Sequence, residues 1–172
     1  FKIAQKTLQI LRKKSWNNIK IKDVYQNQNK FKIKNKNDLL ISINKYFDYL
    51  LKKNLPTIEK SSAQDMLFEV LMARFDILNI HRKSIINIIN HIKSKPHDFI
   101  SLIPTFLESM ILILSLANIN VNGIKGAAKI KGVFVLYIMT SFTWSKDETS
   151  SLEKTMTTLD NYLTQINKFK IL

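Results

Sequence analysis

Residues 15–40, SWNNIKIKDVYQNQNKFKIKNKNDLL, join two helical patterns through a short, polar and strongly basic segment. The stretch opens with Ser, Trp and two Asn, and polar side chains of this kind compete for the backbone and favour a break. A short helix is predicted over residues 21–25, with Asp23 in its first turn, where the helix dipole favours a carboxylate. Residues 26–37 follow as the basic segment. This arrangement is typical of a small nucleic-acid-binding unit, here called the head.

On both sides of this stretch, apolar residues recur at helical spacing. Residues 1–14 form one helix, and a second begins near Asp38, capped by Asn35 or Asn37, and ends before Pro56. Further helices are predicted over residues 64–78, 80–92, 99–117, 127–144 and 152–169, with Asp98 as a cap and 118–126 as a loop. About nine helices and no strand follow. The predicted fold is all-α, with a head over residues 1–53 and a helical body over residues 54–172.

The composition favours an anionic partner. The chain has 172 residues, a formal net charge of +14 and no cysteine, which excludes disulfides and thiolate chemistry. Residues 1–60 contain 15 Lys and Arg against 4 Asp and Glu, whereas residues 61–172 contain 12 against 9. A chain rich in Lys, Asn and Ile can simply reflect an A+T-rich genome, but such a bias should affect both parts. The basic excess near the N-terminus therefore indicates nucleic acid or a membrane surface.

The sequence offers no pattern of a catalytic or metal site. No zinc pattern includes the histidines, and GIKGAAKIKG at 123–132 follows no predicted strand, so a phosphate loop is not expected. Arg74 and Asp76 are interpreted as solvated or capping charges. Residues 133–144 are nearly all apolar but fall short of the ~20 residues of a membrane span, so we interpret them as a buried interface. We expect no enzyme, no metal and no cofactor.

The head resembles the TetR family of transcriptional regulators. Residues 15–25 are similar to the family pattern of Gly, an aromatic residue, three variable residues, Thr, Val, two variable residues, Ile and Ala. Trp16 stands at the aromatic position, Lys20 at the Thr and Val24 at the Ile. Residues 33–40, IKNKNDLL, resemble the Phe-x-x-Lys-x-x-Leu-Leu that opens the fourth helix of the family. The resemblance implies a helix-turn-helix that binds double-stranded DNA.

The body extends the resemblance over the whole chain. Residues 65–78, 107–132 and 144–160 are similar to a bacterial subgroup of TetR-like proteins. Through this subgroup the chain also resembles the lipid-binding ubiquinone-biosynthesis protein that shares the TetR fold. The resemblance implies a cytoplasmic homodimer with a ligand pocket in the body.

In the head, the resemblance implies phosphate contacts from Lys20 and Lys36 and groove contacts from Lys30, Lys32 and Lys34. Lysines alone would supply salt-sensitive affinity more than base discrimination, and a merely solvated basic surface is the alternative. One departure affects this assignment. In the family about fourteen positions separate the Ala of the second helix from the Phe before the fourth, whereas Tyr25 and Ile33 are eight apart. Either the recognition helix is shortened, or the sequence lacks residues there.

In the body, two C-terminal helices are expected to pair with those of a second copy in a four-helix bundle. The expected interface residues are Gly132, Leu136, Met139, Met156, Leu159 and Leu163. A pocket for a small apolar ligand is expected around Met72, Phe75, Phe106 and Met110, with ordinary core packing as the alternative for each.

Two functions remain open. The first is a DNA-binding homodimeric regulator that responds to a small apolar or amphipathic effector. The second is a TetR-fold protein that binds a lipid or isoprenoid, touches a membrane surface and does not read DNA sequence. The basic N-terminal third favours the first function, and the short segment before residue 33 favours the second.

Overall fold

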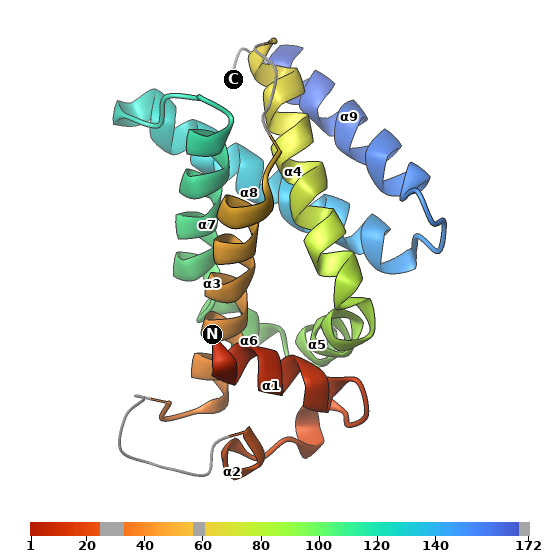
Figure 1. Cartoon of the computed structure of the whole chain (residues 1–172). Coiled ribbons are helices and arrows are strands. Elements are labelled where there is room, and N and C mark those ends of the chain that lie inside the picture. The colour runs from red at the N-terminus through yellow and green to blue at the C-terminus, as the bar shows by residue number, and fades with distance from the viewer. Residues whose placement is uncertain (25–32, 57–60, 169–172) are drawn as a thin grey trace.

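The structure, a computed structural model, describes residues 1–24, 33–56 and 61–168, and these residues form helices and loops without a strand. The elements are α1 (Lys2–Leu11), the 3-10 helix η1 (Trp16–Asn18), α2 (Ile21–Val24), α3 (Lys36–Asn54), α4 (Ala63–Ile80), α5 (Arg82–Ser94), α6 (Pro96–Ile100), α7 (Ile103–Leu116), α8 (Gly123–Lys146) and α9 (Glu153–Lys168). Figure 1 shows their arrangement. The predicted all-α fold is confirmed for the described residues.

The head forms one end of the molecule (Figure 1). Its first helix, α1, buries Ala4, Leu8 and Leu11, which stand on one helical face, and it packs against both α3 and α5. Trp16 of η1 is buried as well. A four-residue helix such as α2 is too short to be stable alone, so the packing of these neighbours must hold it in place.

A capping box begins α3, the long helix of the head, and thereby fixes the residue at which this helix starts. The Asn35 side chain accepts a hydrogen bond from the Asp38 N–H at 3.0 Å, and the Asp38 carboxylate accepts one from the Asn35 N–H at 3.0 Å. This reciprocal pair satisfies two backbone donors that a helix start leaves free. Of the two predicted caps, the structure therefore selects Asn35. The helix then runs through the molecule and contacts α1, α4 and α7.

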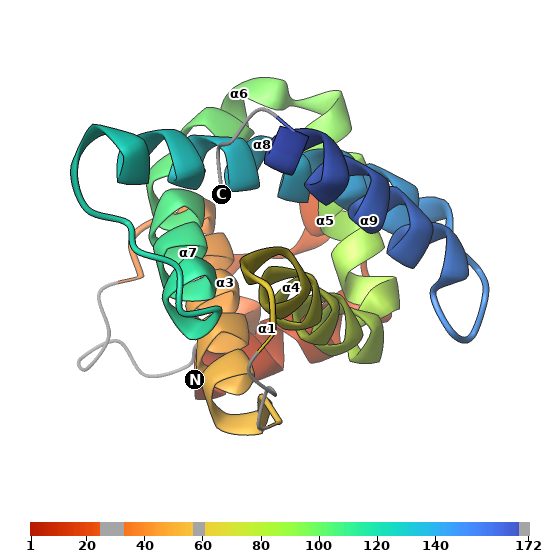
Figure 2. The same ribbon diagram turned by 90° about the horizontal axis from the view of Figure 1, so that it is seen from above.

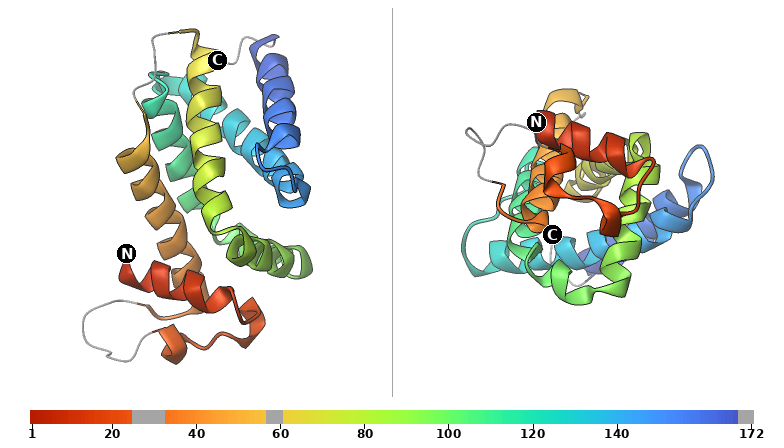
Figure 3. Two further views of the ribbon diagram at one scale, coloured as in Figure 1. Left: turned by 45° about the vertical axis from the view of Figure 1, so that its right-hand side comes forward. Right: turned by 90° about the horizontal axis from the view of Figure 1, so that it is seen from below.

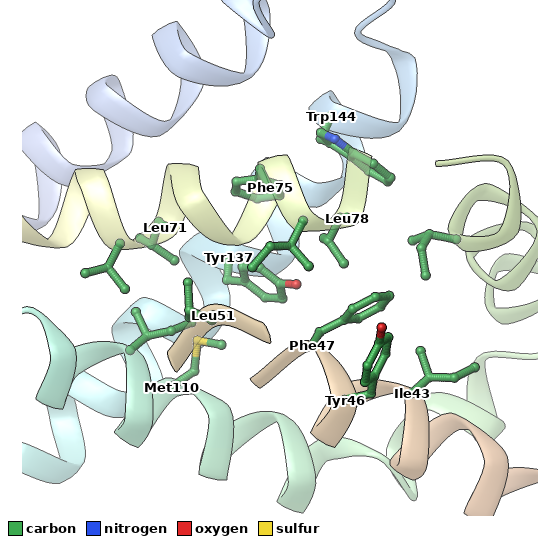
Figure 4. Packing of buried hydrophobic residues seen from close by; sticks show 14 of the residues in the cluster. Ile43, Tyr46, Phe47, Leu51, Leu71, Phe75, Leu78, Met110, Tyr137 and Trp144 are labelled. Atoms are coloured by element: carbon green, nitrogen blue, oxygen red, sulfur yellow. The ribbon is translucent and has the colours of Figure 1, made fainter. Parts of the chain in front are cut away.

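In the body, α3, α4 and α7 stand side by side, while α8 crosses them and α9 packs on α8 and α4 (Figures 2 and 3). Their apolar faces form one continuous core with the head. Figure 4 shows Phe47 of α3, Phe75 of α4 and Tyr137 of α8 converging in this core. No helix in the described ranges reaches the length and apolarity that crossing a membrane requires.

The region around Pro96 differs from the expectation. Instead of one helix over 99–117 capped by Asp98, two helices occur, and Pro96 lies in the first turn of the short α6. Proline suits that position because a first-turn N–H has no helical partner. Asp98 lies inside α6, and its carboxylate accepts from His91 Nε2 at 2.8 Å and lies 2.7 Å from His97 Nε2. The predicted cap is therefore wrong.

The loop before α8 is shorter than expected, because α8 begins at Gly123 and not near residue 127. Gly123 has φ +67°, a conformation that favours glycine. Gly126 lies so close to the loop that a Cβ there would be 1.9 Å from the Val121 carbonyl oxygen. Glycine at this position therefore allows the loop to lie against the first turn of α8.

Candidate functional site

An apolar cavity of about 160 Å³ is lined by residues of α3, α4, α5, α6, α7 and α8. One wall is aliphatic and comes from successive turns of α5: Ile85, Ile88, Ile89 and Ile92. Aromatic side chains from the other helices line much of the rest: Phe47, Phe99, Phe106, Tyr137, Phe142 and Trp144. A cavity lined in this way excludes water and suits an apolar molecule.

A polar cluster borders the cavity. Arg74 of α4 is fully buried, and its guanidinium donates to Asp48 Oδ1 at 2.6 Å and to Asn44 Oδ1 at 2.8 Å. Asn44 Nδ2 donates in turn to Ser109 Oγ at 2.7 Å and to the Thr105 carbonyl at 3.2 Å. Ser109 Oγ donates to Asp48 Oδ2 at 2.8 Å. The cluster ties α3, α4 and α7 together, and Asp48 balances the charge of Arg74.

Three residues that line the cavity each have a buried polar side-chain atom with no hydrogen-bond partner among the described residues. These atoms are Arg74 Nε, Thr105 Oγ1 and Trp144 Nε1. Buried polar groups in folded proteins are almost always paired. Each of these atoms exposes less than 1 Å², so they lie in the wall of the cavity and do not face its open space.

The helix α5 contacts the cavity through one face and the head through another. Its isoleucines line the cavity, whereas its polar residues Ser84, Asn87 and His91 hold the head. Ser84 Oγ donates to the Leu8 carbonyl at 2.7 Å, on the buried face of α1. One helix thus lines the cavity and contacts the head. Figure 1 shows α5 next to α1.

Asn87 and His91 attach α5 to the segment around η1. Asn87 Nδ2 donates to the carbonyls of Leu11 and Lys14 at 3.2 and 2.7 Å, and its Oδ1 accepts from the Trp16 N–H at 2.9 Å. The His91 ring lies with Nδ1 3.0 Å from Asn17 Oδ1. These contacts satisfy backbone groups where α1 ends, a point at which a helix leaves carbonyls without partners.

The lysines of the head fall into two groups. Lys36 Nζ donates to the carbonyls of Trp16 and Asn17, both at 3.1 Å, and lies 5.9 Å from the centre of the Trp16 ring. Burial, with a smaller contribution from Lys95, lowers the pKa of Lys36. In contrast, Lys20 and Lys34 are exposed. Lys36 thus connects the start of α3 to η1 from within the head.

Comparison with known proteins identifies the fold of the chain but not its function. No known family model matches the sequence, and no curated protein matches it either. Among solved structures, the TetR transcriptional regulator from Nitrosomonas europaea ATCC 19718 superposes with a TM-score of 0.71, over 96% of both chains, at 17% sequence identity. The chain has a TetR-type fold. At this identity, the match establishes the arrangement of the helices and leaves the function to be argued from the site.

Within the TetR-type fold, the predicted DNA-contacting lysines differ in exposure and in hydrogen bonding. Lys20 and Lys34 lie exposed in the head. The ammonium of Lys36 donates to two backbone carbonyls and keeps a third N–H donor, so the phosphate contact that the resemblance implied stays a prediction. Lys30 and Lys32 lie outside the described residues. So does Tyr25, the last residue of the predicted second helix.

Of the four predicted pocket residues, Phe106 lines the cavity. Met72, Phe75 and Met110 are not among its lining residues. Phe75 and Met110 are fully buried elsewhere in the core. Phe75 stacks on Tyr137, with the ring centres 5.5 Å apart, and so supports the cavity wall from outside.

Sequence analysis missed the polar side of this site. Arg74 was interpreted as a solvated or capping charge, and that interpretation is wrong because the side chain is fully buried. The sequence does contain a signal for the burial of Arg74. Arg74 lies three residues after Leu71 and four before Leu78, so helical spacing places it within the apolar face of α4. An arginine at such a position needs a buried partner, here Asp48.

The predicted interface residues also divide into two groups. Leu136, Leu159 and Leu163 are buried within the single chain, where α8, α9 and α4 pack together. Met139 and Met156 are 44% and 39% exposed. Gly132 is half-buried. An exposed apolar face on α8 and α9, here called the outer face, therefore comprises Val135, Met139, Phe142 and Met156.

No three His, Asp or Glu side chains in the described part of the chain approach closely enough to hold a metal ion.

Proposed function

We propose that the protein is a TetR-like transcriptional regulator that binds DNA as a homodimer and responds to a small apolar effector in the cavity. The observation that carries this proposal is the double role of α5. Its isoleucines line the cavity, and its polar residues hold the head. A molecule that alters the position of this helix would therefore alter the position of the head.

The DNA-binding surface belongs to residues 1–53 in this proposal. Residues 54–172 bind the second copy and, together with the α3 residues that line the cavity, the effector. Exposed Lys20 and Lys34 would contact phosphates or the groove, together with Lys30 and Lys32. Lys36 is assigned a supporting role, because its ammonium already binds two carbonyls. The high density of positive charge in residues 1–60 favours an anionic partner at this end.

The second copy would cover the outer face. Val135, Met139 and Phe142 follow one another at helical spacing on α8, and Met156 of α9 is exposed as well. Exposed apolar stripes of this kind are typical of subunit interfaces. Gly132, near the start of the stripe, would permit a close helix approach. Leu136, Leu159 and Leu163 would contribute indirectly, by holding α8 and α9 together.

A second function, a TetR-fold lipid or isoprenoid carrier without sequence-specific DNA binding, is favoured by one observation. Lys36, the lysine of the family-like pattern, already uses two of its three N–H donors for carbonyls inside the head. The cavity argues against it, because about 160 Å³ accommodates a compact molecule better than a long chain.

The deciding experiment measures binding to the DNA upstream of the protein's own gene, against salt and against unrelated competitor DNA. We expect sequence-selective binding by the unaltered protein. In Lys20→Glu/Lys34→Glu, we expect affinity to fall about tenfold or more, and the salt dependence to become shallower, because phosphate contacts are lost. Lys125→Glu at the start of α8, at the far end of the molecule (Figure 1), makes a single change of the same type and should retain binding.

Weak binding without sequence preference that disappears as salt rises would contradict the regulator and favour the carrier. Equal losses in the head variant and in Lys125→Glu would show that overall charge, and not the head, determines binding.

A further inference from the structure

We propose that an effector enters the cavity between α5 and α8, past the side chain of Phe142, and that the second copy covers this entrance in the dimer. This inference rests on the proposed function for the effector and for the outer face, and it adds the route by which the effector is exchanged. It does not depend on whether the head binds DNA.

Phe142 stands at the boundary between the cavity and the surface. It is one of the residues that line the cavity, and its side chain is 46% exposed. The other lining residues are buried or half-buried. The wall of the cavity therefore reaches the surface of the single chain at this ring.

Side chains, and not helix packing, close the cavity between α5 and α8. Both helices line it, but α5 packs mainly on α1, α4, α6 and η1, whereas α8 packs mainly on α7 and α9. Two side chains of α5 reach across to α8. Near the start of α5, the Arg82 guanidinium donates to the Trp144 carbonyl at 3.0 Å. Near its end, Lys93 Nζ lies 5.6 Å from the centre of the Phe142 ring.

These two contacts differ in strength. Arg82 combines its hydrogen bond with a position 4.9 Å from the centre of the Trp144 ring. Lys93 and Phe142 are both exposed and meet in a cation–π contact, which is weak at exposed sites. Exposed side chains change rotamer within nanoseconds. The space between the two helices therefore opens at the Phe142 end.

Phe142 is also part of the outer face, which a second copy covers in the proposed function. It continues the exposed stripe of Val135 and Met139 on α8. The cores of subunit interfaces are packed as densely as protein interiors. A partner helix on this face would therefore leave the Phe142 ring no space to turn outward. Dimer formation closes the entrance, and effector exchange is fastest in the monomer.

Fluorobenzene is a suitable probe, because the cavity of about 160 Å³ is close to an engineered apolar cavity of about 150 Å³ that binds benzene. Fluorine NMR would measure its association and dissociation rates in the unaltered full-length protein, in Met139→Glu and in Met139→Glu/Phe142→Ala. Met139 does not line the cavity, and Met139→Glu is expected to be monomeric.

We expect both rates to rise by at least about tenfold from the unaltered dimer to Met139→Glu, and by about tenfold again when Phe142 is truncated. The affinity should change much less than the rates, because an entrance determines the barrier in both directions and not the stability of the bound state. A residue that only contacts the bound probe would alter the dissociation rate alone.

Two matched pairs of variants in the Met139→Glu background test the assignment. Val135→Ala also shortens an exposed outer-face residue, but Val135 does not line the cavity, so both rates should stay as they are. Lys93→Gln keeps the Phe142 ring and removes the cation beside it, so both rates should rise by about two- to fivefold. Lys83→Gln, at another exposed lysine of α5, should leave them unchanged.

Equal rates in Met139→Glu with and without Phe142→Ala would overturn the entrance, and so would a rise in the dissociation rate alone. Both results would leave the proposed effector standing. If Met139→Glu is monomeric by sedimentation and exchanges the probe no faster than the unaltered dimer, the second copy does not cover the entrance. A dimer that persists in Met139→Glu would overturn that coverage together with the proposed outer-face interface. Failure of fluorobenzene to bind would overturn the effector part of the proposed function and this inference with it.

Discussion

At the scale of a single residue, Lys36 shows how a sequence pattern identifies a position without giving its role. The Ile-x-x-Lys-x-x-Leu-Leu spacing placed a lysine at the start of a helix, and the structure has it there. The direction of the Lys36 side chain depends on residues twenty and nineteen positions earlier in the chain. Its ammonium donates to the carbonyls of Trp16 and Asn17. Such long-range partners leave no local signal in the sequence.

The structural role of Lys36 predicts a loss of stability in Lys36→Met. The variant keeps the apolar stem but loses two charge-assisted hydrogen bonds at a half-buried site, so we expect the free energy of unfolding to fall by about 1–2 kcal/mol. Urea unfolding followed by circular dichroism would measure this. Lys34→Met, at an exposed site, is the control and should unfold as the unaltered protein does. Equal stability of both variants would argue against the supporting role.

At the scale of elements, the turn between α8 and α9 illustrates what local chemistry does encode. Residues 147–151 contain the acidic and hydroxyl side chains that cap helices. In the structure, Asp147 is buried and accepts from Thr149 and from both the N–H and the hydroxyl of Thr155, the latter two at 2.8 Å. The break at Pro96 was foreseen less well, because a proline marks a boundary without showing that a new helix begins there.

Asp147 should make stability depend on acid pH. Burial alone would raise the pKa of Asp147, but hydrogen bonds from Thr149 and Thr155 outweigh it and lower the pKa from 3.8 to about 2. A lowered carboxyl pKa stabilises the fold above the unfolded value, and this contribution disappears as pH falls from about 4 to about 2. Asp147→Asn should therefore cost about 2 kcal/mol at pH 7.

The measurement for Asp147 is chemical denaturation of both proteins at several pH values. The difference in unfolding free energy between them should shrink toward zero between pH 4 and pH 2. A difference that stays constant through this range would show that the carboxylate charge is not what the turn requires.

At the scale of the whole molecule, helical periodicity was enough for the all-α class and for most helix positions, but not for the cavity. Six of the described helices contribute to its lining, and Arg74, Asp48 and Thr105 come from three of them. Which helix faces converge depends on tertiary packing, which no single window of sequence contains. The same limit explains why, of the four predicted pocket residues, Phe106 lines the cavity and Met72, Phe75 and Met110 do not.

The outer face predicts the oligomeric state. If a second copy covers it, Met139→Glu should place a charge in an apolar interface and shift the protein from dimer to monomer by at least about tenfold in dissociation constant. Sedimentation velocity would detect the shift. Ile111→Glu on α7, where the side chain is 42% exposed against 44% for Met139, is the matched control and should remain dimeric. A dimer unaffected by Met139→Glu would place the interface elsewhere.

The two faces of α5 have a thermodynamic consequence. The helix α5 contacts both the cavity and the head. Its position therefore affects effector binding in the cavity and DNA binding by the head. Coupling between two binding equilibria is reciprocal. An effector that weakens DNA binding by some factor must then be bound more weakly, by the same factor, on the operator. DNA-bound protein would accordingly respond only at higher effector concentrations than free protein. The affinity of the operator for the protein would then determine the effector concentration at which the protein dissociates.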